Sequence, residues 1–392
     1  MTKRLRLIAV AAVAFSALAA CFPNPQPEQA ANIVAGGIHT CAVLGSGTVK
    51  CWGNNGWGQL GDGTTTDSPA PVVVAGVTAL PGITTVAGGE HHTCAVVAGG
   101  AVSCWGRNDS GQVGRPVSPH ESTAATIAGL SGARAVAAGD FHTCALVPLF
   151  EGSQVGTVKC WGKGTSGQLG DDHFTTSPVP VTVAGITNAV AIGAGGNTTC
   201  AALLGGTLWC WGDNTSGKLG IGSNVLFVGT PEPVSTATGM FNVVDVSPGY
   251  RHTCAHTSTG GVWCWGDESI GQLGNGVAVA GGFSNVPVAV SGMLAGLIDT
   301  GSDFTCAELS LQGINCWGRN DLGQVGDGTT TSRYVPTAPT GLSGVVRVTA
   351  GDGHACVILV DSSVHCWGWN GFGQLGDGTN VNRLTSVPVA GI

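Results

Sequence analysis

The chain has 392 residues and a formal net charge of -8; 66 residues are glycine, and only 10% are charged. This length excludes a mini-protein, a hydrophobic content of 43% excludes a disordered tail, and glycine without a three-residue period excludes a collagen-like chain. The acidic balance argues against a nucleic-acid-binding surface, which requires clustered basic residues. Fifteen cysteines, an odd number, leave at least one outside any pairing.

The first twenty residues are typical of an export signal. Basic residues at positions 3, 4 and 6 precede an apolar run over residues 7–17, which is too short to form a permanent membrane-spanning helix. Residues 18–21, Leu-Ala-Ala-Cys, resemble the lipobox of bacterial lipoproteins, in which the cysteine is lipidated and becomes the mature N-terminus. We expect a signal peptide over residues 1–20 and lipidation of Cys21; secretory cleavage near Ala19, leaving a free thiol, is the alternative. Three prolines within residues 22–31 predict that the segment 21–31 is an extended tether.

The other fourteen cysteines divide the rest of the chain into seven similar units. Each unit has two cysteines, ten residues apart in six units and sixteen apart in the third, and Trp-Gly follows the second cysteine. Successive second cysteines are 50 to 56 residues apart. Self-similarity at a period of about fifty residues is typical of solenoids, propellers and arrays.

Within each unit, short runs rich in β-branched residues alternate with glycine and proline. In the first unit these runs cover residues 33–37, 39–43, 49–53 and 71–74, with a Gly-Ser-Gly turn at residues 45–47. The pattern predicts four strands per unit. Folding the second and third strands about Ser46 places Cys41 opposite Cys51, close enough for a disulfide within an antiparallel hairpin.

A repeated cysteine spacing can also indicate zinc sites. Zinc sites place two cysteines two to four residues apart, whereas these cysteines are ten apart and each pair lies on its own hairpin. Because the chain carries an export signal, disulfides are favoured over zinc. The predicted bridges are Cys41–Cys51, Cys94–Cys104, Cys144–Cys160, Cys200–Cys210, Cys254–Cys264, Cys306–Cys316 and Cys356–Cys366.

The repeated unit resembles a known repeat family. It reads Gly-Gly-x-His-Thr-Cys-Ala-Val, then Val-x-Cys-Trp-Gly-x-Asn-x-x-Gly-Gln-Leu-Gly-Asp-Gly, and is similar to the repeat of the regulator of chromosome condensation family over residues 32–392. The resemblance implies an all-β, seven-bladed β-propeller with four-stranded antiparallel blades, here with one hairpin disulfide per blade. A closed ring leaves no long exposed sheet edge. We expect residues 388–392 to lie beside residues 33–35 and close the ring.

The family resemblance does not by itself predict an activity. Nucleotide exchange on a nuclear GTPase, together with chromatin binding, is the family's best-known activity and conflicts with an acidic, exported, oxidised chain. The repeats are also similar to those of a secreted bacterial β-lactamase inhibitor, which uses aromatic residues on one propeller face. No residue-level motif of that inhibitor's contact surface can be matched in this sequence.

Two kinds of residue recur at fixed positions in the units. A histidine lies two residues before the first cysteine in five units, and threonine or phenylalanine replaces it in the other two. A ring of imidazoles suggests metal or proton chemistry, but tolerance of Thr198 and Phe304 favours a structural role. The tryptophan after each second cysteine is predicted to pack between blades. These tryptophans are Trp52, Trp105, Trp161, Trp211, Trp265, Trp317 and Trp367.

Three Asp-Gly-Thr loops, which begin at Asp62, Asp327 and Asp377, resemble calcium sites superficially. A calcium loop needs several oxygen-bearing side chains at alternate positions, and these loops offer one carboxylate each, so we expect turns. The chain also lacks a nucleophile elbow, a His-Glu-x-x-His pair and a P-loop. We therefore predict no catalytic residue, no metal site and no cofactor, and a protein that is not an enzyme.

The loop before each Gly-Gln-Leu-Gly segment varies between units and is more informative about binding. Units 2 to 4 have serine at the equivalent position, whereas units 5, 6, 7 and 1 have large apolar residues. In a closed ring these four units are neighbours, so an apolar arc is predicted on one face; packing of each side chain onto its own loop is the alternative. The candidate binding face consists of Trp57, Ile270, Leu322, Trp369 and Phe372.

The predicted function is a protein-binding or scaffold module on the extracytoplasmic side, either lipid-anchored to a membrane or secreted. The expected partner is a protein of the cell envelope, with no nucleic acid, and the propeller is expected to be a monomer. The alternatives are a proteinaceous inhibitor of a secreted enzyme and an envelope glycan-binding or glycan-degrading propeller. An insertion at residues 147–152 adds an apolar hairpin tip in unit 3, whose role the sequence leaves open.

Overall fold

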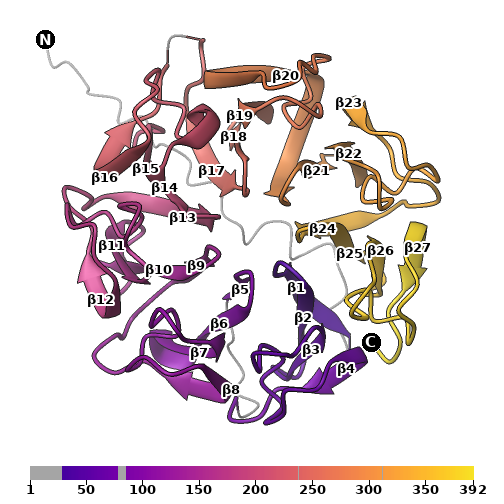
Figure 1. Cartoon of the computed structure of the whole chain (residues 1–392), viewed down its shortest axis with the longest axis horizontal. Helices are drawn as coiled ribbons and strands as arrows, with labels where there is room; N and C mark the ends of the chain where they lie inside the picture. The colour runs from indigo at the N-terminus through magenta and orange to yellow at the C-terminus, as the bar shows by residue number, and fades with distance from the viewer. Residues whose placement is uncertain (1–28, 78–84, 237, 311) are drawn as a thin grey trace, which may run out of the picture.

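Seven four-stranded antiparallel blades surround a central axis (Figure 1). This arrangement is seen in a computed structural model, which describes residues 29–392 except 78–84, 237 and 311. The first strand of each blade lies nearest the axis, and the fourth lies at the outer edge. The predicted all-β propeller is therefore confirmed.

The first four blades follow one another along the chain. Blade 1 contains β1 (Ala30–Ala35), β2 (His39–Leu44), β3 (Val49–Gly53) and β4 (Ser68–Val73). Blade 2 contains β5 (Thr85–Gly88), β6 (His92–Val97), the 3-10 turn η1 (Ala98–Gly100), β7 (Ala101–Arg107) and β8 (His120–Thr126). Blade 3 contains β9 (Ala135–Ala138), β10 (His142–Pro148), β11 (Gly156–Gly162) and β12 (Ser177–Thr182). Blade 4 contains β13 (Ala189–Gly195), β14 (Thr198–Leu203), β15 (Leu208–Asp213), the 3-10 turn η2 (Thr215–Gly217) and β16 (Phe227–Pro233).

The last three blades complete the ring. Blade 5 contains β17 (Val243–Pro248), β18 (His252–Thr257), β19 (Gly261–Asp267) and the first half of β20 (Phe283–Thr300). The second half of β20 is the first strand of blade 6, followed by β21 (Phe304–Leu309), β22 (Gly313–Gly318) and β23 (Arg333–Thr337). Blade 7 contains β24 (Val345–Ala350), β25 (His354–Leu359), β26 (Val364–Gly368) and β27 (Arg383–Pro388).

The hairpin between the second and third strands has the register that the cysteine spacing predicts. Cys41 lies opposite Cys51, and the equivalent cysteines are opposite one another in the other six blades. All seven predicted disulfides are present, and their sulfurs are fully buried. Disulfides at this density are typical of proteins in an oxidising compartment.

The antiparallel strand order gives the ring two different faces. The turns between first and second strands and the loops between third and fourth strands lie on one side, which we call the loop face. The hairpin turns between second and third strands and the links between blades lie on the other side, which we call the hairpin face. The variable loops of the candidate binding face therefore belong to the loop face.

The seven repeated tryptophans are buried between blades, as predicted. The indole Nε1 of Trp105 donates a hydrogen bond of 2.9 Å to the main-chain oxygen of Gln59 in the preceding blade. The other six make the same bond to the equivalent residue, which is lysine in blade 4 and glutamine elsewhere. Each blade is thus bound to its neighbour by one large apolar ring and one buried hydrogen bond.

The expected closure by the terminal strands is wrong. Strand β27 is the outermost strand of blade 7 and pairs with β26, whereas β1 is the innermost strand of blade 1 and pairs with β2. Because each of these blades takes all four strands from one continuous segment, side chains close the ring instead. Ile33 and Val389 share one buried cluster, and Trp52 Nε1 donates to the oxygen of Gln374 across the junction. Figure 1 shows the C-terminus beside blade 1.

Candidate functional site

The repeated histidines hold neighbouring blades together. Nε2 of His39 lies 2.7 Å from the hydroxyl of Thr93 in the next blade, and four more histidines make the same contact. Burial, reinforced by nearby histidines, lowers the pKa of His39 to about 3, so the ring is neutral at ordinary pH. The predicted structural role is confirmed for these five residues, which are His39, His92, His142, His252 and His354.

Two junctions between blades depart from this pattern. At the junction of blades 4 and 5, Thr198 replaces the histidine and donates to the main-chain oxygen of Asp213 in its own blade. At the junction of blades 6 and 7, Phe304 replaces the histidine, and Ala355 stands where other blades have the partner threonine. Both residues are fully buried. At the junction of blades 6 and 7, loss of the imidazole is therefore matched by loss of the hydroxyl that it would bind, whereas at the junction of blades 4 and 5 the partner Thr253 keeps its hydroxyl, which donates to the main-chain oxygen of Lys218.

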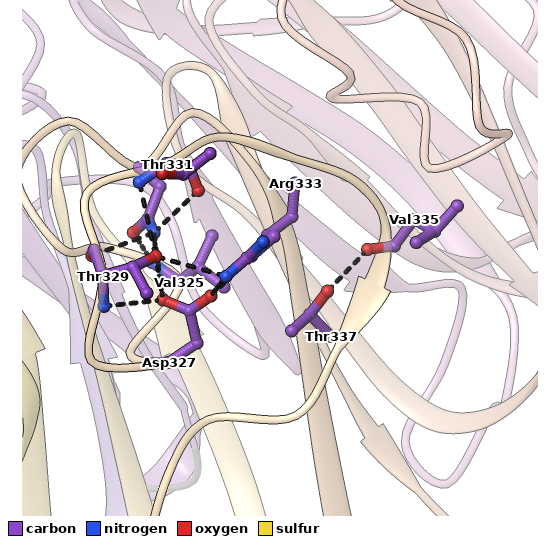
Figure 2. A network of polar contacts seen from close by, with 8 residues as sticks. Val325, Asp327, Thr329, Thr331, Arg333, Val335 and Thr337 are labelled. Carbon is purple, nitrogen blue, oxygen red and sulfur yellow. Dashed lines mark hydrogen bonds and ion pairs between the residues drawn. The ribbon is translucent and has the colours of Figure 1, made fainter.

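The Asp-Gly-Thr loops are hydrogen-bonded turns, as expected. Figure 2 shows the loop of blade 6, where Asp327 accepts bonds from the amide and hydroxyl of Thr329 and from Arg333. Burial acts to raise the pKa of Asp327, but these hydrogen bonds outweigh it and hold the pKa below its usual range. Blade 7 repeats the arrangement with Asp377 and Arg383. The carboxylates of Asp327 and Asp377 therefore accept their hydrogen bonds from residues of their own loops.

Three of the five predicted binding-face residues form one group, which we call the Trp369 cluster: Leu322, Trp369 and Phe372. The rings of Trp369 and Phe372 are 5.5 Å apart and pack edge to face. A Cβ placed on Gly353 would lie 3.3 Å from Trp369 and 3.4 Å from Leu322, so both side chains close over this glycine. The cluster therefore joins the loops of blades 6 and 7, and each of its side chains is half-buried.

The other two predicted residues, Trp57 and Ile270, are also half-buried on the loop face. The contacts of Trp57 run toward blade 2, away from the Trp369 cluster. The guanidinium of Arg107 lies 4.6 Å from the centre of the indole ring, and the ring of His91 lies 6.4 Å away. Packing of this kind between a cation and an aromatic face is favourable. Trp57 is therefore partly covered by its neighbour.

A pocket of about 290 Å³ lies beside the Trp369 cluster, and the sequence did not predict it. Leu322 and Trp369 line one part of the wall, and Tyr250 lines another. The buried Asp303 lies 3.5 Å from Arg251 and 3.6 Å from Arg319, which are both about half exposed. Burial raises the pKa of Asp303, and the two arginines oppose this effect. The pocket therefore combines an apolar wall with exposed guanidinium groups.

The sequence did not predict the pocket because much of its lining comes from a position that is unremarkable in any single unit. Tyr250, Arg251, Ser302 and Asp303 occupy the short turn before the second strand, where blade 1 has glycine and isoleucine. Variation at this turn was a signal in the sequence. The turns before the second strands of blades 5 and 6 lie against the loops after the third strands of blades 6 and 7 only because the blades are arranged in a ring.

Carboxylates line the central channel, on the first strands of the blades or just after them. They belong to Glu90, Asp140, Asp245, Asp299 and Asp352. Burial, together with the charges of Glu90 and Asp352, raises the pKa of Asp140 to about 7. Burial also raises the pKa of Asp245 to about 7. Within the part of the chain that the structure describes, no group of three or more His, Cys, Asp or Glu residues is arranged to hold a metal ion.

No helix among the described residues is long and apolar enough to cross a bilayer. The predicted signal peptide, lipidation of Cys21 and most of the tether fall on residues 1–28, which lie outside the described residues.

Comparison with known families identifies the repeat. A model described as the regulator of chromosome condensation (RCC1) repeat matches residues 46–96, 99–146, 156–202, 205–256, 315–358 and 361–390. A second model of the same repeat matches residues 30–59, 83–112, 189–218, 243–272 and 345–374. The chain belongs to the regulator of chromosome condensation repeat family. The resemblance that the sequence suggested is therefore confirmed.

Relatives within this family differ widely in their full length. The chain is 30% identical to the ultraviolet-B receptor UVR8 of Arabidopsis thaliana over 312 residues, which is 79% of this chain and 70% of the receptor. It is also 30% identical to the human E3 ubiquitin-protein ligase HERC2, but this match spans 82% of the chain and 6% of the ligase.

Solved structures agree with the fold. Prp20p from Saccharomyces cerevisiae superposes with a TM-score of 0.77 at 21% identity, covering 93% of this chain and 88% of that protein. A structure of yeast RCC1 (Prp20) bound to Kap60 gives a TM-score of 0.76 at 21% identity, covering 87% and 83%.

Proposed function

We propose that this propeller is a protein-binding module on the extracytoplasmic side, lipid-anchored through Cys21, which binds a cell-envelope protein with its loop face. The Trp369 cluster and the adjoining pocket form the contact region. In this proposal the propeller binds its partner and does not catalyse a reaction.

The juxtaposition of an apolar cluster and a half-exposed arginine pair is the observation that carries the proposal. Interface centres are enriched in tryptophan and arginine, and a few such residues supply most of the binding free energy. Trp369 and Arg319 both line the pocket, and Arg319 is 42% exposed. A partner side chain that entered the pocket would contact apolar and charged groups at once.

Chemistry elsewhere on the ring supports binding over catalysis. The five buried histidines are neutral and bound to threonines, and the loop carboxylates of Asp327 and Asp377 are bound to their own loops. Family members also support a binding role, since yeast RCC1 (Prp20) is described bound to Kap60, and Prp20p is described as binding Gsp1p and histones.

Two features support the compartment and the anchor. The seven disulfides suit an oxidising environment outside the cytoplasm. The segment before the propeller combines a basic start, an apolar run and the Leu-Ala-Ala-Cys sequence that ends at Cys21. A Cys21→Ser variant should lose the membrane fraction that the wild type shows; an unchanged membrane fraction would contradict lipid anchoring.

Crosslinking in intact cells tests the contact region. A Leu322→Ser, Trp369→Ser, Phe372→Ser variant should capture the envelope partner at least about tenfold less than wild type, because it loses the apolar anchor residues. The matched control is Phe174→Ser, Val225→Ser, Leu226→Ser, which removes exposed apolar side chains from the loop face of blades 3 and 4. Equal capture by wild type and both variants would contradict the proposed site.

A further inference from the structure

The hairpin face carries an apolar rim that the proposed binding site does not use. We define the apolar rim as the side chains of Leu149, Phe150, Leu204, Phe241 and Leu294, which are 53% to 69% exposed. They lie on the hairpins of blades 3 and 4 and on the links that follow blades 4 and 5. The hairpin turns of blades 1 and 2, at residues 45–47 and 98–100, contain only glycine, serine and alanine.

Main-chain hydrogen bonds make the rim one continuous edge in blades 4 and 5. The link that contains Phe241 is bonded to both neighbouring hairpins, since the amide of Val243 donates to Gly206 and the amide of Ser258 donates to Asn242. The amide of Ala295, next to Leu294, donates to Gly260. Leu204, Phe241 and Leu294 are therefore held on one hydrogen-bonded edge rather than on independent loops.

The insertion of blade 3 extends this edge. Its tip is closed by a bond of 3.0 Å from the amide of Ser153 to the oxygen of Phe150. The guanidinium of Arg134 binds the oxygen of Gln154 in the insertion and the oxygen of Val190 in blade 4. Gly156 also pairs with Ala189, which joins the sheets of blades 3 and 4. The insertion is thus fastened against the neighbouring blade.

The rim is almost free of charge. The hairpins and links that form it, residues 148–155, 204–207, 234–242, 258–260 and 291–294, contain one charged residue, Glu151. The loop-face loops of the same blades, residues 163–176, 214–226 and 268–282, also expose apolar side chains but contain five charged residues. Insertion of the rim into an apolar environment therefore costs little desolvation of charge, in contrast to the loops opposite.

The tether leaves the propeller on the same face. Strand β1 runs from Ala30 toward the loop face, so Ala30 lies at the hairpin-face end. There the main-chain oxygen of Gln29 accepts a bond from Gly45, and its side chain donates to Asp361 in blade 7. Gln29 lies eight positions after Cys21 in the chain, so the two residues are at most about 28 Å apart. A lipid on Cys21 would hold the hairpin face close to the bilayer.

We infer that the hairpin face of blades 3 to 5 rests on the phospholipid bilayer, with the apolar rim inserted among the headgroups. This inference rests on the proposed anchor at Cys21. The described chain begins at Gln29 beside β1 of blade 1, across the ring from blade 4 (Figure 1), so the anchor and the rim would attach the protein at two opposite edges. The tether raises the local concentration of the rim at the surface, so weak insertion is sufficient. The Trp369 cluster then faces away from the membrane.

Vesicle flotation tests the rim without the anchor. The exported Cys21→Ser chain is mixed with vesicles of phosphatidylcholine and phosphatidylglycerol, and its partition coefficient is measured. Adding Phe150→Ser and Leu204→Ser should lower partitioning by roughly tenfold or more, because two exposed apolar side chains are lost. Adding Phe174→Ser and Leu226→Ser, which are exposed on the loop face, should change it less than about twofold. No partitioning, or equal losses in both variants, would overturn the inference.

Hydrogen exchange on the lipidated wild-type chain in the same vesicles gives a second readout. Residues 148–155 and 234–242 should exchange more slowly on vesicles than in the Cys21→Ser chain free in solution, and the Phe150→Ser, Leu204→Ser variant should lose this protection. Protection confined to the loop face would overturn the inference. A change of oligomeric state in the Phe150→Ser, Leu204→Ser variant would also overturn it, because it would show that the rim contacts a second copy of the protein. Failure of the anchor is recognised separately, because it leaves the membrane fraction of the Cys21→Ser, Phe150→Ser, Leu204→Ser chain in cells as large as that of wild type.

Discussion

Two neighbouring junctions between blades are packed with different side chains: the junction of blades 6 and 7 is apolar, whereas the junction of blades 7 and 1 contains a hydrogen-bonded pair. At the second junction, Nε2 of His354 lies 2.8 Å from the hydroxyl of Thr40, which donates to the oxygen of Gln374. At the first junction, Phe304 and Ala355 occupy the equivalent positions. A buried polar group without a partner is costly, and here the imidazole and the hydroxyl are both absent. At the junction of blades 4 and 5, which lacks only the imidazole, the hydroxyl of Thr253 is still satisfied by the oxygen of Lys218.

One contact is common to both junctions. Trp52 donates to the oxygen of Gln374, and Trp367 donates to the oxygen of Gln324, each at 2.9 Å. Every junction therefore keeps the hydrogen bond of the tryptophan, whereas the histidine–threonine pair can be replaced by apolar side chains. The junction of blades 6 and 7 also adjoins the candidate site, since Asp303 and Gly353, which both line the pocket, come one and two residues before Phe304 and Ala355.

The largest effect on stability is expected from removing the buried aromatic ring at the junction of blades 6 and 7. Phe304→Ala should lower the free energy of unfolding by about 3 to 5 kcal/mol, because a fully buried ring is removed and a cavity remains. Denaturant unfolding of the disulfide-intact protein measures it. Phe150→Ala, at a residue 69% exposed, is the control and should change stability by less than about 0.5 kcal/mol. A loss below about 1 kcal/mol for Phe304→Ala would show that this junction is not well packed.

The pH dependence of stability should differ between the polar and apolar junctions. Burial lowers the pKa of His354 from 6.5 to about 3. The unfolded chain therefore binds a proton that the folded chain does not, and the contribution of His354 to stability is lost as pH falls from 6.5 toward 3. A Thr40→Ala, His354→Phe variant copies the apolar junction. Between pH 6.5 and 4 it should lose about 3 kcal/mol less stability than wild type.

Unfolding free energies at several pH values measure this difference. The raised pKa values of Asp140 and Asp245 act in the opposite direction, since their contribution is lost as pH rises toward 7, but both residues are present in wild type and variant. Phe304→Leu, which changes no titratable group, should keep the wild-type pH dependence. Parallel curves for wild type and the Thr40→Ala, His354→Phe variant would contradict the prediction.

The smallest effect is expected from restoring the polar pair at the apolar junction. Phe304→His alone should cost about 1 to 3 kcal/mol, because the imidazole faces Ala355 without a hydroxyl partner. Adding Ala355→Thr should recover about 1 kcal/mol, measured as the coupling in a double-mutant cycle of unfolding free energies. Additive effects of the two substitutions would show that the pair does not act as a unit.

Much of the fold was predictable because its signals are local. Cys41 and Cys51 lie on one hairpin, and the turn between them sets which residues face each other, so the spacing alone predicted the bridge. Period and repeat number predicted the seven blades. The closure of the ring was predicted incorrectly, since nothing in residues 388–392 distinguishes pairing with β1 from pairing with β26.

The candidate site was predictable only in part. Comparison of units picked out Leu322, Trp369 and Phe372, because each differs from serine or asparagine at the same position elsewhere. The contacts of Trp57 with Arg107 and His91 depend on side chains about 35 to 50 positions away, and these contacts turn Trp57 toward blade 2. Phe241 of the apolar rim lies in a link that follows no repeated pattern, so only its exposure in the structure identifies it.

The sequence by itself determined the number of blades, the strand order, the hairpin register and the seven disulfides, because each follows from residues within one unit of about fifty. Tertiary structure decided which side chains of different units meet: Leu322 and Trp369 over Gly353, the pocket beside them, and the rim on the opposite face. These contacts depend on the rotation from one blade to the next and on the path of each loop. No local periodicity encodes either quantity, because both are set when the ring closes and buries its junctions.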